Sequence, residues 1–306
     1  MHAVVLRYFE AVAEFGSIRR ASERLHISAS AVNRQILKLE DHFGTPLFER
    51  RPDGMRLTDT GRLVLHHARD TLHDFARLRG DIDKLRGIVS GDVTIATLDS
   101  PAVHFLPEAV ARFVSVHPAV QIRVTACDPI EVLHSVSQGT ADLGLTFSPS
   151  WRRGVTVLEE IACPMCVVMR PEHELASRTS IPLDDCGSHR LIYQDPADTM
   201  QPFVGDEMET FKRAHRPVAV SNTQAVVKRL LLRGVGIAFY TRLGFSEELA
   251  AGKLVAVPLE GERLSKLRLC LITSSDRMPT VAGHAMACHL QEALASFGTG
   301  LDQGGK

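Results

Sequence analysis

Side chains that can recognise nucleic acid gather on one face of a segment with helical periodicity. Its apolar positions recur three or four residues apart, at Val32, Ile36, Leu39 and Phe43. The opposite face carries Ser30, Asn33, Arg34 and Lys38. Such groups can hydrogen-bond base edges or pair with phosphates. Ser28 is the expected N-cap of this helix, and Ala29 at its start can offer a base only a methyl contact.

Two shorter helical patterns precede this segment. The first ends at Gly16, and Ser17 is the expected N-cap of the second, which stops at a tight turn over residues 25–27. Two short helices joined by so brief a turn must cross steeply. This is helix-turn-helix geometry, which leaves the outer face of one helix open for the DNA major groove.

Residues 45–61 predict a basic β-hairpin after the third helix. Two short strands, around residues 47–50 and 55–58, flank a Pro-Asp-Gly turn. The hairpin carries three arginines, Arg50, Arg51 and Arg56. We expect their guanidinium groups to reach phosphates beside the groove, as in a winged helix-turn-helix. The alternative is a solvated charged hairpin with no ligand.

A long helix is predicted after Thr58, which is its expected N-cap. Its apolar side chains recur at heptad-like spacing, at Leu65, Ala68, Leu72, Phe75 and Ile82. This stripe could pack within the chain. Because no other segment of the first 90 residues is long enough to cover it, we favour pairing with a second protomer.

From residue 91 onward short apolar strands alternate with helices, which predicts mostly parallel α/β sheets. The expected strands are 92–98, 120–126, 142–147, 166–170, 190–193, 217–220, 236–240, 254–259 and 267–273. The expected helices are 101–116, 129–138, 197–214, 222–233 and 278–297.

A small-molecule site is expected at the carboxyl ends of these strands. Ligands of open α/β sheets bind there, where helix N-termini offer unpaired N–H donors. The first choice is Ser100, which precedes Pro101, although it could also be a plain helix cap. The other candidates are Asp99, Asp128, Phe147, Gln194 and Asp195. Since Asp99 and Asp128 would repel an anion, a neutral polar or aromatic ligand is at least as plausible as a carboxylate.

Composition is consistent with a small and a larger globular domain. The chain has 306 residues, 44% of them hydrophobic and 23% charged. Residues 1–90 hold 15 Lys and Arg against 12 Asp and Glu, a net +3, so the rest of the chain is at −4. This excess is a weak nucleic-acid signal alone. The charged N-terminus resembles neither a secretory nor a spanning segment, so we expect a cytoplasmic protein with free thiols at its six cysteines.

Motifs for catalysis, metals and cofactors are not found. The sequence holds no G-x-S-x-G elbow, phosphate loop or G-x-G-x-x-G, so we expect no enzyme and no cofactor. Cys163 and Cys166 have C-x-x-C spacing, which suits a redox switch or half a metal site, but they lie in an apolar run and we favour two buried structural cysteines. His66 and His67 point about 100° apart on a helix, a poor geometry for chelation.

The N-terminal residues resemble one family closely. The segments FEAVAEFGSIRRASERLHIS, SAVNRQILKLEDHFGTPLFER and RLTDTGR, between Phe9 and Arg62, look like the LysR-type DNA-binding domain. Weaker similarity continues through GDVTIATLDSPAVHFLPEAVARFVSVHP, GTADLGL and GVGIAFY. The resemblance therefore covers nearly the whole chain.

The resemblance implies a DNA-binding transcriptional regulator. Its expected parts are a winged helix-turn-helix (1–58), a linker and dimerisation helix (59–88) and an α/β effector domain (89–306) like a two-lobed periplasmic binding protein. One lobe would span about 91–162 and 268–300, and the other about 163–267. A homodimer or homotetramer would bind an inverted-repeat promoter site and contact RNA polymerase. A small-molecule effector would lie between the lobes.

Some residues depart from the family pattern. Ala29 stands where many members have Gln, and Asn33 where they have Ser, so the base preference should differ. Arg19 and Arg20 replace smaller residues, and we interpret them as phosphate contacts. The family places an effector-contacting Ser or Thr at the position of Ser100.

Two other classes of protein compete with this interpretation. A solute-binding protein would explain the α/β part but would leave residues 1–62 without a purpose. An architectural DNA-binding protein that binds no ligand would show no effector-dependent change in its footprint.

Overall fold

The computed structural model describes residues 2–52, 54–148, 153–194 and 200–303. The chain divides into two compact units, Met1–Gly87 and Ile88–Lys306. Hydrophobic clusters of buried residues form separately in each unit. None of the described helices is long and apolar enough to cross a membrane.

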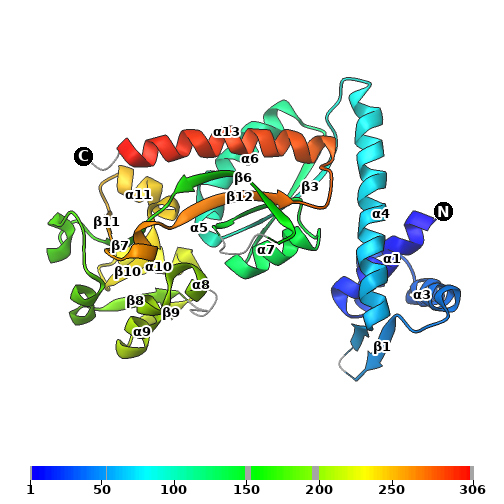
Figure 1. Cartoon of the computed structure of the whole chain (residues 1–306), viewed down its shortest axis with the longest axis horizontal. Coiled ribbons are helices and arrows are strands. Elements are labelled where there is room, and N and C mark those ends of the chain that lie inside the picture. The colour runs from blue at the N-terminus through cyan, green and yellow to red at the C-terminus, as the bar shows by residue number, and fades with distance from the viewer. Residues whose placement is uncertain (1, 53, 149–152, 195–199, 304–306) are drawn as a thin grey trace. The chain divides into compact units, whose positions relative to one another are not determined.

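The first unit contains the predicted helices and hairpin. In chain order they are α1 (His2–Phe15), α2 (Ile18–Leu25), α3 (Ala29–Phe43), β1 (Phe48–Arg51), β2 (Gly54–Leu57) and α4 (Asp59–Lys84) (Figure 1). The hydroxyl groups of Ser17 and Ser28 accept hydrogen bonds from the Arg20 and Ala31 N–H groups, at 3.4 and 3.3 Å. Both predicted N-caps are therefore confirmed. Asp53, in the predicted turn, lies outside the described residues.

The core of this unit lies between α1, α3 and the hairpin. Phe9, Val32 and Ile36 are fully buried, and the rings of Phe9 and Phe48 lie 5.1 Å apart. The prediction that Phe43 also faces the core was wrong, because its side chain is 47% exposed. Phe43 is the last residue of α3, and Gly44, with φ +66°, ends the helix.

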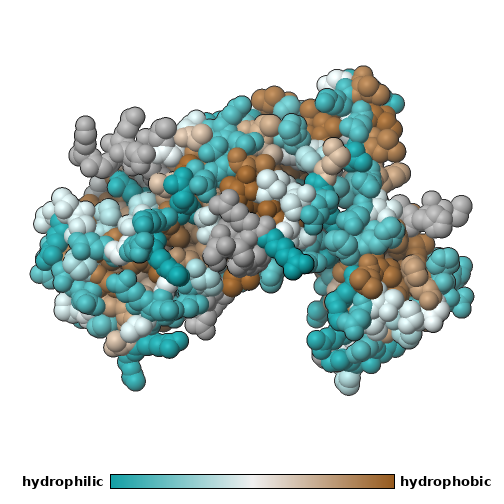
Figure 2. Space-filling model, viewed as in Figure 1, coloured by the Kyte–Doolittle hydropathy of each residue, from teal (hydrophilic) through white to brown (hydrophobic). Residues whose placement is uncertain are grey.

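The apolar stripe of α4 has two different environments. Thr58 is its N-cap, as predicted, and accepts a hydrogen bond from Gly61 N–H at 2.9 Å. Leu65 and Ala68 are buried in the cluster that α1 forms with α4, so the expectation that the first unit could not cover the stripe was wrong for this half. Later positions are exposed, namely Phe75, Leu78, Ile82 and Leu85. Figure 2 shows hydrophobic residues at the surface around this end of α4.

The second unit contains two five-stranded sheets. The first has the strand order β4-β3-β5-β12-β6. Its strands are β3 (Gly91–Thr97), β4 (Val120–Ala126), β5 (Leu143–Phe147), β6 (Val155–Ala162) and β12 (Arg268–Ser274). Its helices are α5 (Asp99–Val103), α6 (Phe105–Val116), α7 (Pro129–Ser137) and α13 (Val281–Gln303). Helix α13 packs on β3, β6 and α6 (Figure 1).

The second sheet has the order β11-β7-β10-β8-β9. Its strands are β7 (Met165–Met169), β8 (Leu191–Gln194), β9 (Ala219–Ser221), β10 (Ile237–Thr241) and β11 (Val255–Pro258). The helices around it are α8 (Gln201–Val204), α9 (Asp206–Ala214), α10 (Gln224–Leu232), α11 (Ser246–Ala250) and α12 (Glu262–Ser265), with 3-10 turns η1 (Glu174–Ser177), η2 (Leu183–Ser188) and η4 (Arg242–Phe245). The chain passes between the sheets from β6 to β7 and again on entering β12.

Strand directions correct the sequence analysis, because the sheets are mixed. Parallel pairing joins β3 to β4 and β5, and β8 to β9 and β10. Antiparallel pairing joins β12 to β5 and β6, and β7 to β10 and β11. Each antiparallel pair of these two sheets involves β7 or β12, the strands that begin where the chain changes sheets. Parallel pairing was predicted from a strand-helix-strand repeat, and these two strands do not follow that repeat.

Two predicted helices are interrupted. The expected helix 101–116 breaks at His104 between α5 and α6. The expected helix 197–214 breaks at Gly205, whose φ of +84° is outside the helical region, and its first residues lie outside the described range. Strand β6 was not predicted, because its sequence VTVLEEIA ends its apolar run with two glutamates.

Candidate functional site

Helix α3 presents to solvent most of the side chains predicted for base contacts. Ser28, Ala29, Ser30, Arg34 and Lys38 are exposed, and Asn33 is half-buried. Within the described residues, Arg34 and Lys38 have no hydrogen bond or ion pair, so the two cations are available to a ligand.

The hairpin is tied to this face by one side-chain contact. Arg50 Nη2 donates a hydrogen bond to Asn33 Oδ1 at 3.0 Å. The bond joins a β1 residue to the exposed side of α3 and orients the Asn33 amide. The structure thus brings together two residues that the sequence analysis had nominated separately, and gives a helix and a wing one continuous polar surface.

The other arginines differ in their partners. Arg51 donates from Nε and Nη2 to Glu49 Oε2, at 3.2 and 2.8 Å, and this contact lowers the pKa of the Glu49 carboxyl. Arg19 forms an ion pair with Glu23 at 3.1 Å. Arg20 and Arg56 are exposed. The exposed ion pairs of Arg51 and Arg19 contribute little to stability, so a phosphate can replace the carboxylate partner.

Glu40 positions the hairpin relative to α3, which the sequence analysis missed. Its Oε1 accepts hydrogen bonds from the backbone N–H groups of Leu47 and Phe48, at 2.8 and 3.1 Å. A carboxylate that holds two backbone donors fixes the start of β1 against the helix. A glutamate at the end of an amphipathic helix gives no sequence signal for this contact.

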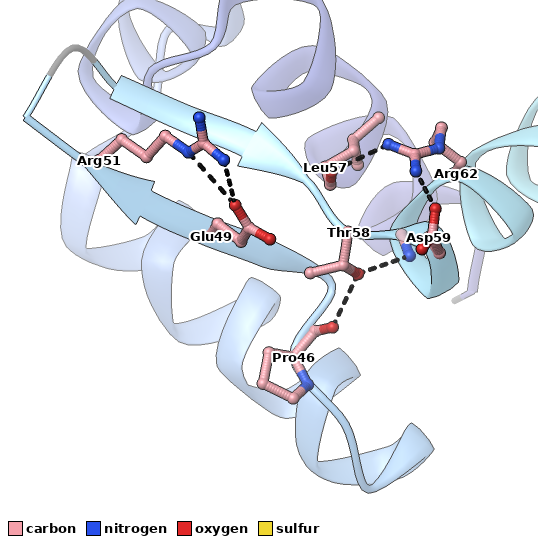
Figure 3. A network of polar contacts seen from close by, with 8 residues as sticks. Pro46, Glu49, Arg51, Leu57, Thr58, Asp59 and Arg62 are labelled. Atoms are coloured by element: carbon pink, nitrogen blue, oxygen red, sulfur yellow. Dashed lines mark hydrogen bonds and ion pairs between the residues drawn. The ribbon is translucent and has the colours of Figure 1, made fainter.

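The junction of the hairpin with α4 is fixed by Thr58 and Gly61. Thr58 Oγ1 donates to Pro46 O at 2.9 Å while it caps α4 (Figure 3). A Cβ atom at Gly61 would lie 2.1 Å from Leu47 O, so only glycine permits this approach. Arg62 bonds to Leu57 O and pairs with Asp59 beside this junction.

The second unit holds a pocket of about 450 Å³ at the carboxyl ends of strands from both sheets. Residues of the first sheet and its loops that line it are Leu98, Asp99, Ser100, Ala126, Cys127, Asp128, Pro129 and Phe147. Residues of the second are Met165, Ile192, Tyr193, Gln194, Met200, Val204, Met208, Lys212, Asn222, Thr223, Phe239, Tyr240 and Thr241. Five of the six predicted ligand residues thus line one pocket, whereas Asp195 lies outside the described residues.

Asp99 joins the two lobes across this pocket. Its Oδ2 accepts a hydrogen bond from the backbone N–H of Gln224 at 2.6 Å, so a carboxylate of one lobe caps helix α10 of the other. Asp99 is the first residue of α5, which places Ser100 one residue inside the helix instead of before it. The expectation that Pro101 is the first helical residue was wrong by two positions.

Asp128 is the N-cap of helix α7. Its Oδ1 accepts hydrogen bonds from the Ile130 and Glu131 N–H groups, each at 2.9 Å. Nearby Cys127 lines the pocket, and burial together with Glu131 and Asp128 raises the pKa of its thiol to about 11. This thiol is therefore protonated at neutral pH.

Several lining residues were missed by the sequence analysis. Lys212 Nζ lies 3.9 Å from Glu209 Oε1 and 6.0 Å from the centre of the Tyr193 ring. Tyr240 is 4% exposed, and its hydroxyl has no hydrogen-bond partner within the described residues. Burial, with the charge of Asp99, raises the pKa of this phenol, so it stays protonated. These residues come from helix α9 and strand β10, and no sequence pattern brings them to the first lobe.

The cysteines of the C-x-x-C pair are both buried. Cys163 lies before β7 and Cys166 within it. Burial raises the pKa values of these thiols to about 11 and about 12. The described residues contain no cluster of three or more histidine, cysteine or acidic side chains that could hold a metal ion.

A winged helix-turn-helix unit joined to a two-lobed α/β unit with a pocket defines a DNA-binding protein with a ligand-sensing domain. The family model for the "LysR substrate binding domain" matches residues 86–295, and that for the "bacterial regulatory helix-turn-helix protein, lysR family" matches residues 4–62. The chain belongs to the LysR family of DNA-binding transcriptional regulators, whose DNA binding is modulated by effectors.

Curated relatives and a solved structure are similar along most of the chain. The RuBisCO operon transcriptional regulator of Allochromatium vinosum is 27% identical over 84% of this chain and 84% of its own. The HTH-type transcriptional regulator CfxR of Cupriavidus necator is 26% identical over 98% and 94%. The crystal structure of full-length CbnR complexed with its target DNA has a TM-score of 0.58 at 22% identity, over 96% and 100%, and supports the fold.

Proposed function

We propose that α3 and the hairpin read an inverted-repeat promoter site. Ser28, Ala29, Ser30, Asn33 and Arg34 would contact bases or nearby phosphates, and the flanking cations would contact phosphates, namely Arg19, Arg20, Lys38, Arg50, Arg51 and Arg56. The observation that carries this proposal is the Arg50–Asn33 hydrogen bond, which makes helix and wing one exposed polar surface. Recognition of both base edges and backbone requires such a surface.

The proposed domains follow from the same arrangement. Residues 1–58 would bind DNA, 59–88 would link and dimerise, and 89–306 would sense the effector, with lobes at about 91–162 with 268–300 and at about 163–267. Exposed Phe75, Leu78 and Ile82 on α4 support pairing of two copies, in a homodimer or homotetramer. A promoter-bound assembly of this kind would act in the cytoplasm and contact RNA polymerase.

The pocket is proposed to bind the small-molecule effector. Ser100, Asp99, Asp128, Phe147, Gln194 and Asp195 are the residues we assign to it. The Asp99–Gln224 bond supports coupling to the lobes, since a ligand that alters this contact alters their spacing. The activity proposed for this pocket is the regulation of DNA binding, without catalysis.

The test is a footprint of the purified protein on its own upstream intergenic DNA, at near-physiological salt so that non-specific binding is suppressed. We expect protection of an extended inverted repeat. The test variant is Arg34→Ala. Its matched control is Arg112→Ala, since Arg112 is exposed on α6 in the other unit.

Each outcome has a definite meaning. Loss of the footprint in Arg34→Ala alone supports the placement of α3 on DNA. Equal protection by both variants contradicts it. A footprint that no small molecule alters would favour the architectural protein over the effector-modulated regulator.

A further inference from the structure

Two carboxylates follow neighbouring strands of the first sheet and line one pocket. Strands β3 and β4 are parallel neighbours whose register pairs Thr97 with Ala126. Asp99 and Asp128 each follow by two residues, beyond the strand ends, where Asp99 begins α5 and Asp128 is the N-cap of α7. Both line the pocket. Like charges that line one pocket are stabilised when a cation lies between them.

Each carboxylate keeps one oxygen for a ligand. Backbone N–H groups occupy Oδ2 of Asp99 and Oδ1 of Asp128. Within the described part of the chain, no hydrogen bond reaches Oδ1 of Asp99 or Oδ2 of Asp128. The hydroxyl oxygen of Tyr240, buried and without a hydrogen bond, is a third acceptor near Asp99. This part of the pocket is therefore rich in acceptors.

The lining offers little to attract an anion. Among the described lining residues, Lys212 is the one that carries a positive charge at every pH near neutrality, and Glu209 lies 3.9 Å from it. Two carboxylates against one opposed ammonium leave the pocket negative. An anionic ligand would meet net repulsion, whereas a cation would meet attraction.

The rest of the lining fits an apolar body attached to a cation. Its aromatic rings are Phe147, Tyr193, Phe239 and Tyr240, and its thioethers are Met165, Met200 and Met208. Aromatic faces attract ammonium groups, and methionine packs around varied apolar shapes. The volume of about 450 Å³ lies within the range of small-ligand sites.

We propose that the effector is an organic amine, whose protonated amino group is held between Asp99 and Asp128 and whose apolar body lies along the aromatic and methionine side chains. The inference rests on the proposed function of the pocket as the effector site, and it names the chemical class that the pocket selects.

Three probes of one shape and different charge test this proposal by titration calorimetry on the full chain. They are 2-phenylethylamine, 2-phenylethanol and phenylacetate. We expect the amine to bind about tenfold or more tightly than the alcohol, and the acid most weakly, since a charge-assisted hydrogen bond contributes about this factor. The amine should also change the DNA footprint.

Asp128→Asn is the matched variant, because asparagine still caps α7 but carries no charge. It should weaken amine binding about tenfold and leave alcohol binding unchanged. Asp92→Asn, at an exposed position of β3, is the control and should change neither.

Equal binding of amine and alcohol, an unchanged amine affinity in Asp128→Asn, tightest binding of phenylacetate, or no binding of any probe at millimolar concentration each overturns the amine class. The footprint without ligand is recorded separately. If it persists while the amine prediction fails, the regulator remains and only the ligand class is wrong.

Discussion

The proposed DNA-contacting surface and the pocket hold their polar groups in different ways. On the DNA-binding unit, exposed side chains bond to one another, as Arg50 does to Asn33. In the pocket, Asp99 and Asp128 bond to backbone N–H groups at helix N-termini. Exposed pairs exchange partners at a cost of about 1 kcal/mol or less, whereas a carboxylate on backbone donors is fixed by the fold. One surface can adapt to its partner, and the other is preorganised.

The largest expected effect is that of Gly61→Ala, at the junction of the hairpin with α4. In Gly61→Ala the new Cβ would meet Leu47 O at 2.1 Å, so the backbone must move, at a cost of about 3 kcal/mol in the free energy of unfolding. Thermal unfolding and the footprint of the full chain measure it. Arg62→Ala, at the next and more exposed position, should cost about 0.5 kcal/mol or less. Equal stability of both variants would mean that the junction is not rigid.

Alkaline pH should lower the stability of the second unit more than that of the first, because all six cysteines lie in the second. Burial raises the pKa values of Cys163 and Cys166 from an ordinary 9.0 to about 11 and about 12. The folded state then binds more protons than the unfolded state, so the stability that these thiols contribute is present below pH 9 and is lost as pH rises toward 11. Near pH 10 the loss is about 1 kcal/mol for each thiol.

Denaturant titrations at neutral pH and near pH 10 measure this loss. The double variant Cys163→Ala and Cys166→Ala should reduce the pH dependence. Cys288→Ala, at an exposed position, is the control and should not. An equal pH dependence in all three proteins would show that the buried thiols do not cause it.

Arg34→Ala should weaken DNA binding by about 2 kcal/mol, as expected for a lost base or phosphate contact. The measurement is a binding titration on the footprinted site at several salt concentrations. Arg112→Ala should bind as the parent does. A loss in Arg34→Ala that is the same on unrelated DNA would assign Arg34 to phosphates and not to bases.

The smallest expected effect is that of Ser100→Ala in the preorganised pocket. It should weaken binding of 2-phenylethylamine by about 1 kcal/mol, the value of one hydrogen bond, and leave DNA affinity unchanged. Ser115→Ala on α6 is the control, since that hydroxyl donates to Arg112 O in its own helix. An unchanged amine affinity would assign Ser100 to the helix and not to the ligand.

Local signals predicted the first unit well. Ser17, Ser28 and Thr58 were identified as caps from their positions before apolar periodic segments, and all three accept the expected bonds. The burial of Leu65 and Ala68 by α1 could not be predicted in this way, because it depends on how helices pack. Periodicity identifies an apolar face but not its partner.

The residues that line the pocket were predictable where they follow the end of a strand, as Asp99 and Asp128 do in one lobe and Gln194 does in the other. The rule that ligands bind at strand ends pointed to these residues, and the structure places them in the lining of one pocket. Lys212 and Tyr240 come from the other lobe and reach the site through the crossing of the chain. Similarly, Glu40 acts through backbone N–H groups in a distant hairpin, which residue type does not reveal.

The chain leaves and re-enters the first lobe at neighbouring residues, since Cys163 N–H donates to Leu267 O at 2.8 Å. The segment between them is thus, in construction, an insertion. Such a segment can be exchanged between related chains as a cassette, because its two ends meet. The part of the pocket lining that comes from the second lobe would then be replaced, while the first unit and the lobe that carries Asp99 and Asp128 stay as they are.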